Sequence, residues 1–349
     1  MILDPILDVF RGKAVTIPPL DGAFRPNTRL DDLPAFAELT EPDNLLAADG
    51  RLLVSSGNAV LAIASGSEPV VAETFPSPVS ALALSPSGDL TVGLESGKLL
   101  IAGKEVSLPA EIRCITALAY ADDGMLWLAN GSAQYLASQW AADLMRKGAS
   151  GSLWSRAVGG DFRKVAGDIA FPYGLYPTRG DVVVSESWRH QLVRFGATGN
   201  HSTVLTHLPG YPARLSPAGD GGAWLTLFAP RNRLIEFVLQ ETHYRQDMID
   251  QVPPAYWIAP ALASNRSFLE PLQCGGIRTM GIHKPWSPSR SYGLVVRLDR
   301  AMQPQFSLHS RANGTRHGIC SVAEKDGRLF VASRGGDCVL SLDLAAGGF

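Results

Sequence analysis

The chain has 349 residues, a formal net charge of −2 and a pI near 6.4. Its 31 Lys and Arg residues do not exceed its 33 Asp and Glu residues, so no positive charge is left over to neutralise phosphates. This balance argues against a nucleic-acid-binding protein and against a polybasic membrane patch. We therefore expect a small-molecule partner, with no nucleic acid and no membrane involved.

The start of the chain and the cysteines bear on its location. MILDPILDVFRGKAV has acidic residues within a short apolar stretch and does not resemble a secretory signal. No apolar run approaches the roughly 20 residues of a membrane span. No C-x-x-C pair occurs among Cys114, Cys274, Cys320 and Cys338, so neither a zinc site nor a disulfide framework is indicated. We predict a cytoplasmic protein with free thiols; a chain that had lost a leader would show the same pattern.

A three-strand unit recurs along the chain. Each copy has an apolar run, an Asp/Ser/Gly turn, a run rich in Val, Leu and Trp, and a further turn and strand. The copies lie at 42–64, 80–103, 115–132, 173–195, 213–238 and 316–344. Radial repeats of about 40 residues with four strands each are typical of β-propeller blades. The sequence therefore predicts an all-β fold, a six-bladed β-propeller that occupies residues 1–349 as a single domain.

Two insertions interrupt the repeats. Residues 133–154 contain Leu136, Trp140 and Leu144 at i, i+4 and i+8 and reach Gly148, which predicts a short helix over one face. Residues 239–290 are rich in Pro, Trp and Tyr, and we expect a long capping insertion that covers a surface or a channel mouth.

Any functional site of a propeller is expected where the innermost strands begin, because these strand entries surround one mouth of the central channel. The entries fall at 42–44, 79–80, 114–116, 172–173, 212–214 and 317–320. They supply the candidate site residues Asp43, Cys114, Tyr173, Arg214, His317 and Cys320, and Trp286 of the capping insertion is expected to reach over the channel.

Several segments carry a family resemblance in the expected order. They are IPPLDGAFRPNTRLDD, SQWAADLMRKGASGSLW, FPYGL, LPGYPARL with GGAWLTLFAPRNRL, and YGLVVRLDRAMQ running to HGICSVAEKDGRLFVASRGGDCVLSLDL. Together they resemble the strictosidine-synthase-like branch of six-bladed propellers, whose superfamily also holds gluconolactonases and other lactonases. The resemblance covers nearly the whole chain and implies enzyme chemistry at the strand entries.

Departures from the family pattern decide the expected chemistry. The resemblance implies a catalytic calcium held by Glu, Asn and Asp side chains at these entries, since calcium prefers several oxygen ligands. Here Asp43 and Asn44 are accompanied by Thr116, Tyr173 and Arg214, so we predict no metal and no cofactor. The resemblance also places the acid/base glutamate of strictosidine synthase at Cys320. A thiol, whose usual pKa is about 8.5, is a poor general acid near neutral pH, which argues against that reaction.

Roles for the candidates follow from their chemistry. Arg214 would orient an anionic ligand group, because guanidinium suits bidentate anion recognition, and Tyr173 would donate a hydrogen bond. His317 or Asp43 would be the base. His317 and Cys320 would form an imidazole–thiolate pair only if the turn at Gly318 redirects one of them, since strand alternation separates them.

Structural explanations for the same residues stay open. Arg214 would then pair with Asp43 or Asp220, the ring of Tyr173 would plug the channel, and Cys320 would be buried for packing.

The predicted function is a metal-independent propeller that binds a small organic molecule in its central channel and acts on it by condensation or by ester or lactone hydrolysis. Two alternatives remain: a non-enzymatic binding or scaffold propeller, and a calcium-dependent lactonase with atypical ligands. The sequence specifies neither a substrate nor an oligomeric state.

Overall fold

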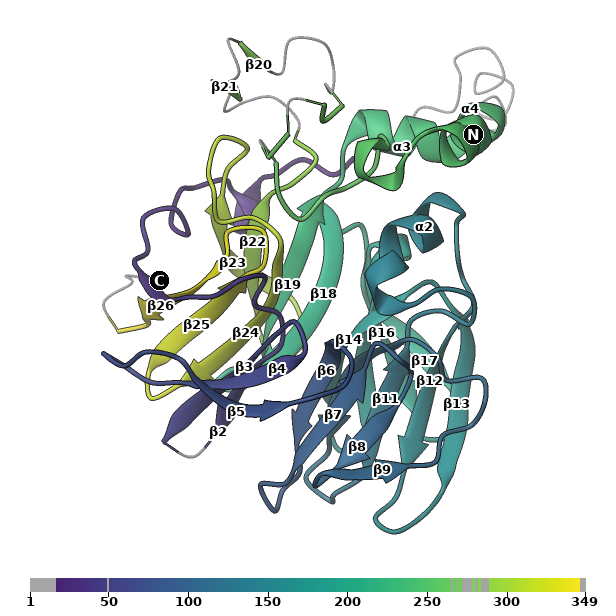
Figure 1. Ribbon diagram of the computed structural model, residues 1–349, viewed down its shortest axis with the longest axis vertical. Helices are drawn as coiled ribbons and strands as arrows, with labels where there is room; N and C mark the ends of the chain where they lie inside the picture. Colours follow the sequence, from purple (N-terminus) through teal and green to yellow (C-terminus); the bar gives the residue numbers. More distant parts are fainter. Residues whose placement is uncertain are drawn as a thin grey trace.

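Six four-stranded antiparallel sheets make up the fold in a computed structural model that describes residues 17–48, 50–264, 266–267, 269–271, 278–279, 282–283 and 289–345 (Figure 1). The first strands of neighbouring sheets contact one another in a closed cycle, from β2 through β6, β10, β14, β18 and β24 back to β2. This ring confirms the predicted six-bladed β-propeller. Among the described residues, no helix is long and apolar enough to cross a membrane.

Each blade runs outward from its channel-lining strand. Blade 1 consists of β2 (Leu45–Ala48), β3 (Arg51–Ser56), β4 (Ala59–Ile63) and β5 (Val70–Thr74); blade 2 of β6 (Val79–Leu84), β7 (Leu90–Leu94), β8 (Leu99–Ile101) and β9 (Lys104–Val106). Blade 3 consists of β10 (Ile115–Tyr120), β11 (Leu126–Asn130), β12 (Gly151–Arg156) and β13 (Phe162–Ile169); blade 4 of β14 (Pro172–Pro177), β15 (Asp181–Glu186), β16 (Gln191–Gly196) and β17 (His201–Leu205). Blade 5 consists of β18 (Gly210–Pro217), β19 (Ala223–Pro230), β22 (Gly293–Leu298) and β23 (Pro304–Ser310).

Blade 6 joins the two ends of the chain. Its inner strands are β24 (Ile319–Lys325), β25 (Arg328–Ser333) and β26 (Cys338–Asp343), and its outer strand is β1 (Ala35–Glu38). Ala35 lies opposite Leu340 and Glu38 opposite Cys338 in the antiparallel pair. The ring is therefore closed by hydrogen bonds between a strand near the start of the chain and one near its end.

Tight turns set the register within the blades. Asp326 and Gly327 join β24 to β25 with φ values of 51° and 71°, so both residues occupy the left-handed region that a two-residue hairpin turn requires. Glycine adopts this conformation without a steric penalty, which explains the Asp-Gly pair that marks the turn in the sequence.

The two insertions gather at one end of the ring (Figure 1). The first contains η2 (Ala137–Gln139) and α2 (Trp140–Met145), as the helical spacing predicted. The second contains α3 (Arg233–Gln240), α4 (Thr242–Gln251), η4 (Pro254–Tyr256) and the short strands β20 (Arg278–Thr279) and β21 (Ile282–His283). A further short helix, η1 (Gly22–Phe24), contacts β23.

The prediction of one strand is wrong. Residues 233–238, expected as the last strand of the fifth repeat, form helix α3, and β22 takes the third place in blade 5. Asn232 caps the helix by accepting a hydrogen bond from the Leu234 backbone N–H, and Ile235, Val238 and Leu239 are buried at helical spacing. The capping insertion therefore begins before residue 239.

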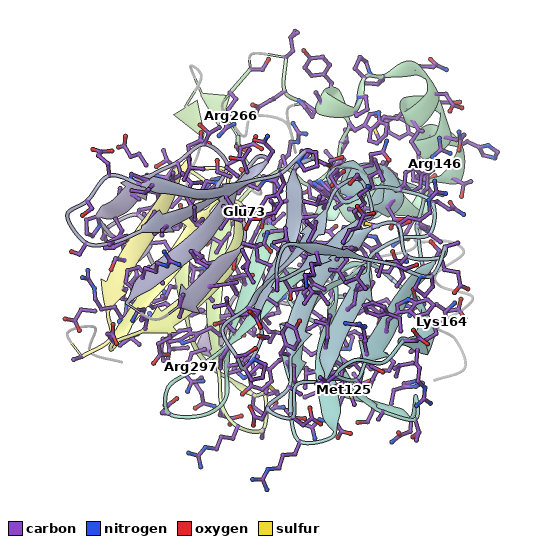
Figure 2. The ribbon with its side chains drawn as sticks, turned by 60° about the horizontal axis from the view of Figure 1, so that its bottom comes forward. Glu73, Met125, Arg146, Lys164, Arg266 and Arg297 are labelled. Carbon is purple, nitrogen blue, oxygen red and sulfur yellow. The ribbon has the colours of Figure 1, made fainter. Side chains whose placement is uncertain are left out.

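The helices cover the end of the channel at which the inner strands begin. Leu144 of α2, Ile235 of α3 and Met248 of α4 belong to one apolar cluster with Tyr211, at the start of β18, and Cys320, at the start of β24. The opposite end carries the turns that join the inner strands to their neighbours. Figure 2 shows the two ends apart, with Arg146 and Arg266 at the first and Met125 and Arg297 at the second.

Candidate functional site

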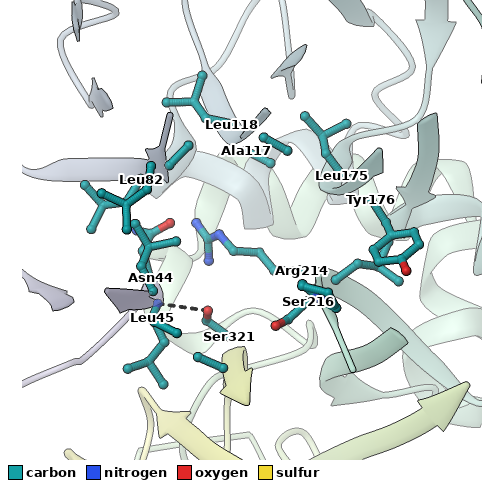
Figure 3. A pocket seen from close by; sticks show the side chains of 18 of the residues that line it. Asn44, Leu45, Leu82, Ala117, Leu118, Leu175, Tyr176, Arg214, Ser216 and Ser321 are labelled. Atoms are coloured by element: carbon teal, nitrogen blue, oxygen red, sulfur yellow. Dashed lines mark hydrogen bonds between the residues drawn. The ribbon is translucent and has the colours of Figure 1, made fainter. Parts of the chain in front are cut away.

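The central channel holds a cavity of about 480 Å³ that opens away from the helices. Its walls are formed by all six inner strands, from Leu45 of β2 to Glu324 of β24. Apolar side chains such as Leu82, Leu118 and Leu175 make about half of the wall, and Ser216, Ser321 and Tyr176 supply polar groups (Figure 3). The sequence predicted a site at the strand entries. Access to this cavity is at the opposite end of the channel.

Arg214 stands at the inner end of this cavity, with its guanidinium near the centre of the ring (Figure 3). Its Nη1 donates to Asp43 Oδ1, and its Nη2 donates to the backbone carbonyls of Ser80 (2.8 Å) and Thr116 (3.2 Å). The guanidinium lies over the ring of Tyr173, 4.9 Å from the centroid. One arginine thus joins the inner strands or strand entries of five blades.

Arg334 is a second guanidinium at the same carboxylate. It lies in the turn between β25 and β26, and its Nη1 donates to Asp43 Oδ2 over 3.4 Å while its Nη2 donates to Glu41 Oε2 over 3.4 Å. Burial alone would lower the pKa of Arg214 and of Arg334, but the Asp43 carboxylate raises both above the usual value. Both guanidiniums are therefore charged, and both hold the same buried anion.

Tyr173 and Cys320 complete this group, which we call the channel cluster: Asp43, Tyr173, Arg214, Cys320 and Arg334. The Cys320 thiol is fully buried and donates to the Gly318 carbonyl over 3.4 Å. Burial, reinforced by the Asp43 charge, raises the pKa of Cys320 to about 12. Burial also raises the pKa of Tyr173 well above its usual value. Both groups are neutral near pH 7, so neither is a nucleophilic anion in this setting.

His317 faces away from the channel cluster. Its Nδ1 shares a hydrogen bond with Ser291 Oγ (2.7 Å), and its Nε2 shares one with the Arg311 carbonyl (2.7 Å). Its hydrogen bonds therefore join His317 to the segments around blade 5, while the Cys320 thiol bonds to Gly318. Strand alternation separates the two side chains, and the turn at Gly318 does not bring them into a hydrogen bond.

Cys114 lies behind the channel cluster rather than in it. A Cβ atom added at Gly131 would stand 3.1 Å from both the Cys114 sulfur and the Phe171 ring, and Phe171 packs edge-on against Tyr173. Burial raises the pKa of Cys114 to about 12. The other predicted contact, Trp286, is outside the described residues.

A buried carboxyl that sequence reasoning missed supports the covering helix. Asp143 of α2 is 1 % exposed and accepts hydrogen bonds from Ser132 Oγ (2.8 Å) and Trp188 Nε1 (2.7 Å). Burial raises the pKa of Asp143, although these two hydrogen bonds oppose the shift. Trp188 in turn stacks on Phe171, with ring centroids 4.5 Å apart. Asp143 therefore fixes α2 and an aromatic layer above the strand entries.

Sequence reasoning also missed Arg334. Its only signal was its place in the Arg-Gly-Gly-Asp turn of the last repeat, directly after the Val-containing run 328–333. Asp220, the other acidic partner considered for Arg214, pairs with Arg297 instead. Arg334, the second cation at Asp43, therefore comes from a turn. Asp220 lies outside the channel cluster.

The donor set at the channel cluster does not fit calcium. Asp43 is its one carboxylate, and both of its oxygens accept hydrogen bonds from guanidiniums. Two positive charges at the same carboxylate would repel a divalent cation, and calcium requires six to eight oxygen ligands. More widely, the described residues contain no group of three or more His, Cys, Asp or Glu side chains placed to hold a metal.

Comparisons with known proteins support the fold. No protein-family model and no curated protein sequence matches the chain. Among solved structures, it is similar to a structural-genomics gluconolactonase candidate (12% identity, 90% of this chain and 94% of the other, TM-score 0.55). It is also similar to a gluconolactonase from Xanthomonas campestris, with 14% identity over 88% of this chain and 87% of the other and a TM-score of 0.53. A streptogramin B lyase is similar as well, with 12% identity over 88% of this chain and 96% of the other and a TM-score of 0.51. At these identities the likeness extends to the propeller fold alone.

Proposed function

We propose that this propeller binds a small organic anion, or a polar carbonyl compound such as a lactone, in its central channel without a metal ion. The observation that supports this most is the position of Arg214. It is the one predicted site residue that lines the open cavity, and its guanidinium is positively charged. A ligand oxygen at this end of the cavity would accept a charge-assisted hydrogen bond.

The remaining walls suit an organic ligand. A cavity of about 480 Å³ whose wall combines apolar and polar groups has room for a small organic molecule and can hydrogen-bond to it. Ser216 and Ser321 offer hydroxyl groups along the wall, and Tyr176 lines it nearer the open end. The ligand would therefore insert its oxygen-bearing end towards Arg214 and leave its other end near solvent.

Binding is favoured over catalysis by the state of the three candidate catalytic residues. Cys320 is a buried neutral thiol, His317 is held by Ser291 and Arg311, and Asp43 is held by two guanidiniums. Both oxygens of the Asp43 carboxylate accept hydrogen bonds from guanidiniums. Under this proposal the protein is cytoplasmic, where its buried cysteines stay reduced.

Metal-free hydrolysis of a lactone or ester is the second candidate, favoured by the gluconolactonases among the structural neighbours. Arg214 would donate to the carbonyl oxygen as negative charge develops on it, and Asp43 would accept a proton from the attacking water. The strictosidine-synthase-type condensation has no equivalent support, because Cys320 is not an acid near neutral pH.

Thermal-shift and calorimetric titrations with gluconate, glucono-δ-lactone and phenylacetate test the binding proposal. We expect saturable binding of at least one compound and a loss of about tenfold or more in affinity in Arg214→Gln. Because Arg214→Gln disturbs a buried ion pair, Ser216→Phe provides a second variant that narrows the cavity without touching that pair. Arg179→Gln, an exposed arginine in a turn at the same end, is the control.

Three results would overturn the proposal: no binding by any of the compounds, equal binding in Arg214→Gln and wild type, or binding that survives Ser216→Phe. Release of acid from the lactone, lost in Asp43→Asn but not in the Arg179→Gln control, would favour the hydrolytic candidate over binding alone.

A further inference from the structure

We propose a second ligand site, distinct from the channel, that takes a small organic anion with an apolar body. It is a cavity of about 370 Å³ that shares no lining residue with the channel cavity. We call it the proline-walled pocket, because its wall includes Pro18, Pro19, Pro26, Pro209 and Pro230. The segment that follows Ile17, the β19–α3 junction and the residues flanking blade 5 meet there.

The wall of this pocket is apolar and stiff. Proline has a fixed φ and no backbone N–H, so a wall rich in proline offers few donors and loses little freedom when a ligand binds. Leu20, Ala229 and Leu294 add further apolar surface. Such a wall suits an aromatic or aliphatic ligand body.

Positive charge distinguishes this pocket from an ordinary apolar hollow. Three arginines line it, and one of them, Arg231, is neutralised by Glu236, with its Nε 2.9 Å from Oε1. Arg233 and Arg311 form no salt bridge among the described residues. Asp31, an acid beside Arg311, accepts hydrogen bonds from Ser310 Oγ and from the Arg311 backbone N–H, and it forms no salt bridge with the Arg311 guanidinium. Two guanidiniums are therefore left for an anionic ligand group.

The backbone of Arg311 is held independently of its side chain. Its N–H donates to Asp31 Oδ2 over 3.3 Å, and its carbonyl accepts from His317 Nε2 over 2.7 Å. Tyr292, which lines the pocket, shares a hydrogen bond with His309 behind the wall, and His309 shares one with Ser307. The pocket is thus pre-organised by side chains outside it, and a substitution of the Arg311 side chain leaves these hydrogen bonds in place. His317, predicted to act in the channel, has a structural position here.

Fluorescence titration with 8-anilinonaphthalene-1-sulfonate, an apolar anion, tests this proposal on the whole protein. The neutral analogue N-phenyl-1-naphthylamine has the same aromatic body without the charge. We expect one saturable site for the anion, bound about tenfold more tightly than the neutral analogue, because a charge-assisted hydrogen bond is lost with the sulfonate. The double variant Arg233→Gln, Arg311→Gln should lose about the same factor, and Arg179→Gln should lose none.

Displacement of the dye by octanoate and by octyl phosphate separates a carboxylate ligand from a phosphate ligand, and displacement by either supports the proposal. Equal affinity for the anion in wild type and the double arginine variant would overturn it, as would equal affinity for the charged and neutral dyes. Dye binding that is lost in Ser216→Phe and kept in the double variant would assign the dye to the channel and would also overturn it.

Discussion

The two ends of the central channel differ in what they contain and in how they are reached. The end with the strand entries carries the buried Asp43 and Cys320 and the partly buried Tyr173, beneath α2 and α3 and an aromatic layer. The other end is open, and its wall combines apolar and polar side chains. Arg214 is the residue that both ends share, because it pairs with Asp43 and lines the cavity. In this channel the reactive side chains and the access to solvent therefore lie at opposite ends.

Removing the charge of Asp43 should have the largest effect on stability. Asp43→Asn leaves Arg214 and Arg334 without their shared carboxylate, and breaking a buried ion pair from one side costs about 3–5 kcal/mol. Urea unfolding measures the loss. Asp122→Asn, at the open end, is exposed and should change the free energy of unfolding by less than about 0.5 kcal/mol. Similar small losses in both variants would contradict a difference between the two ends.

Thiol reactivity should separate the two ends almost as strongly. With a pKa raised to about 12, Cys320 has far less thiolate at pH 7 than an ordinary cysteine, so alkylation by iodoacetamide should be slower by about a thousandfold. Ser216→Cys would introduce a thiol at the open end that reacts at close to the ordinary rate. Both measurements are made in a Cys274→Ser background and read by peptide mass spectrometry. Rapid alkylation of Cys320 in the folded protein would show that the covered end is accessible.

The attachment of the covering helix should depend on pH. Burial alone would raise the pKa of Glu236 in α3, but hydrogen bonds with His190 and Arg231 hold it at about 2, below the usual 4.5. A depressed folded-state pKa gives stability that is present above pH 4.5 and is lost as the pH falls towards 2. Glu236→Gln should therefore cost up to about 3 kcal/mol at pH 7 and progressively less towards pH 3.

Chemical unfolding at several pH values measures this dependence. The matched control is Glu241→Gln, an exposed glutamate at the other end of the same helix, which should change stability by less than about 0.5 kcal/mol at each pH. A destabilisation of Glu236→Gln that did not vary with pH would contradict an electrostatic attachment.

Sequence reasoning recovered the repeats because each blade forms locally. The Asp326-Gly327 turn and the alternating runs on either side of it are set by neighbouring residues, and a propeller repeats such a unit. Aligning the strand entries also brought Asp43, Tyr173, Arg214 and Cys320 to one place, and the pairing of Arg214 with Asp43 was one of the structural alternatives.

The parts that were missed depend on contacts between distant segments. Arg334 reaches Asp43 from a turn rather than from a strand entry, and β1 pairs with β26 across almost the whole length of the chain. Residues 233–238 suit either a strand or a helix, and the cap at Asn232 and the apolar surface beneath α3 decide between them. Which end of the channel is open depends on where the insertions pack, and a strand pattern does not contain that information.

Metal removal should change the melting temperature least of all. This test distinguishes the proposed metal-free protein from a calcium-dependent lactonase. A calcium ion bound to the folded state would stabilise it in proportion to its affinity, so a chelator would lower the melting temperature. Asp43 is held by two guanidiniums, and we expect EDTA to shift the melting temperature by less than about 1 °C and added calcium to have no larger effect. Asp43→Asn would remove the only carboxylate of the channel cluster. A chelator-sensitive melting temperature in wild type that becomes insensitive in Asp43→Asn would restore the calcium alternative, because the two guanidiniums would then have to move away from Asp43 to admit the ion.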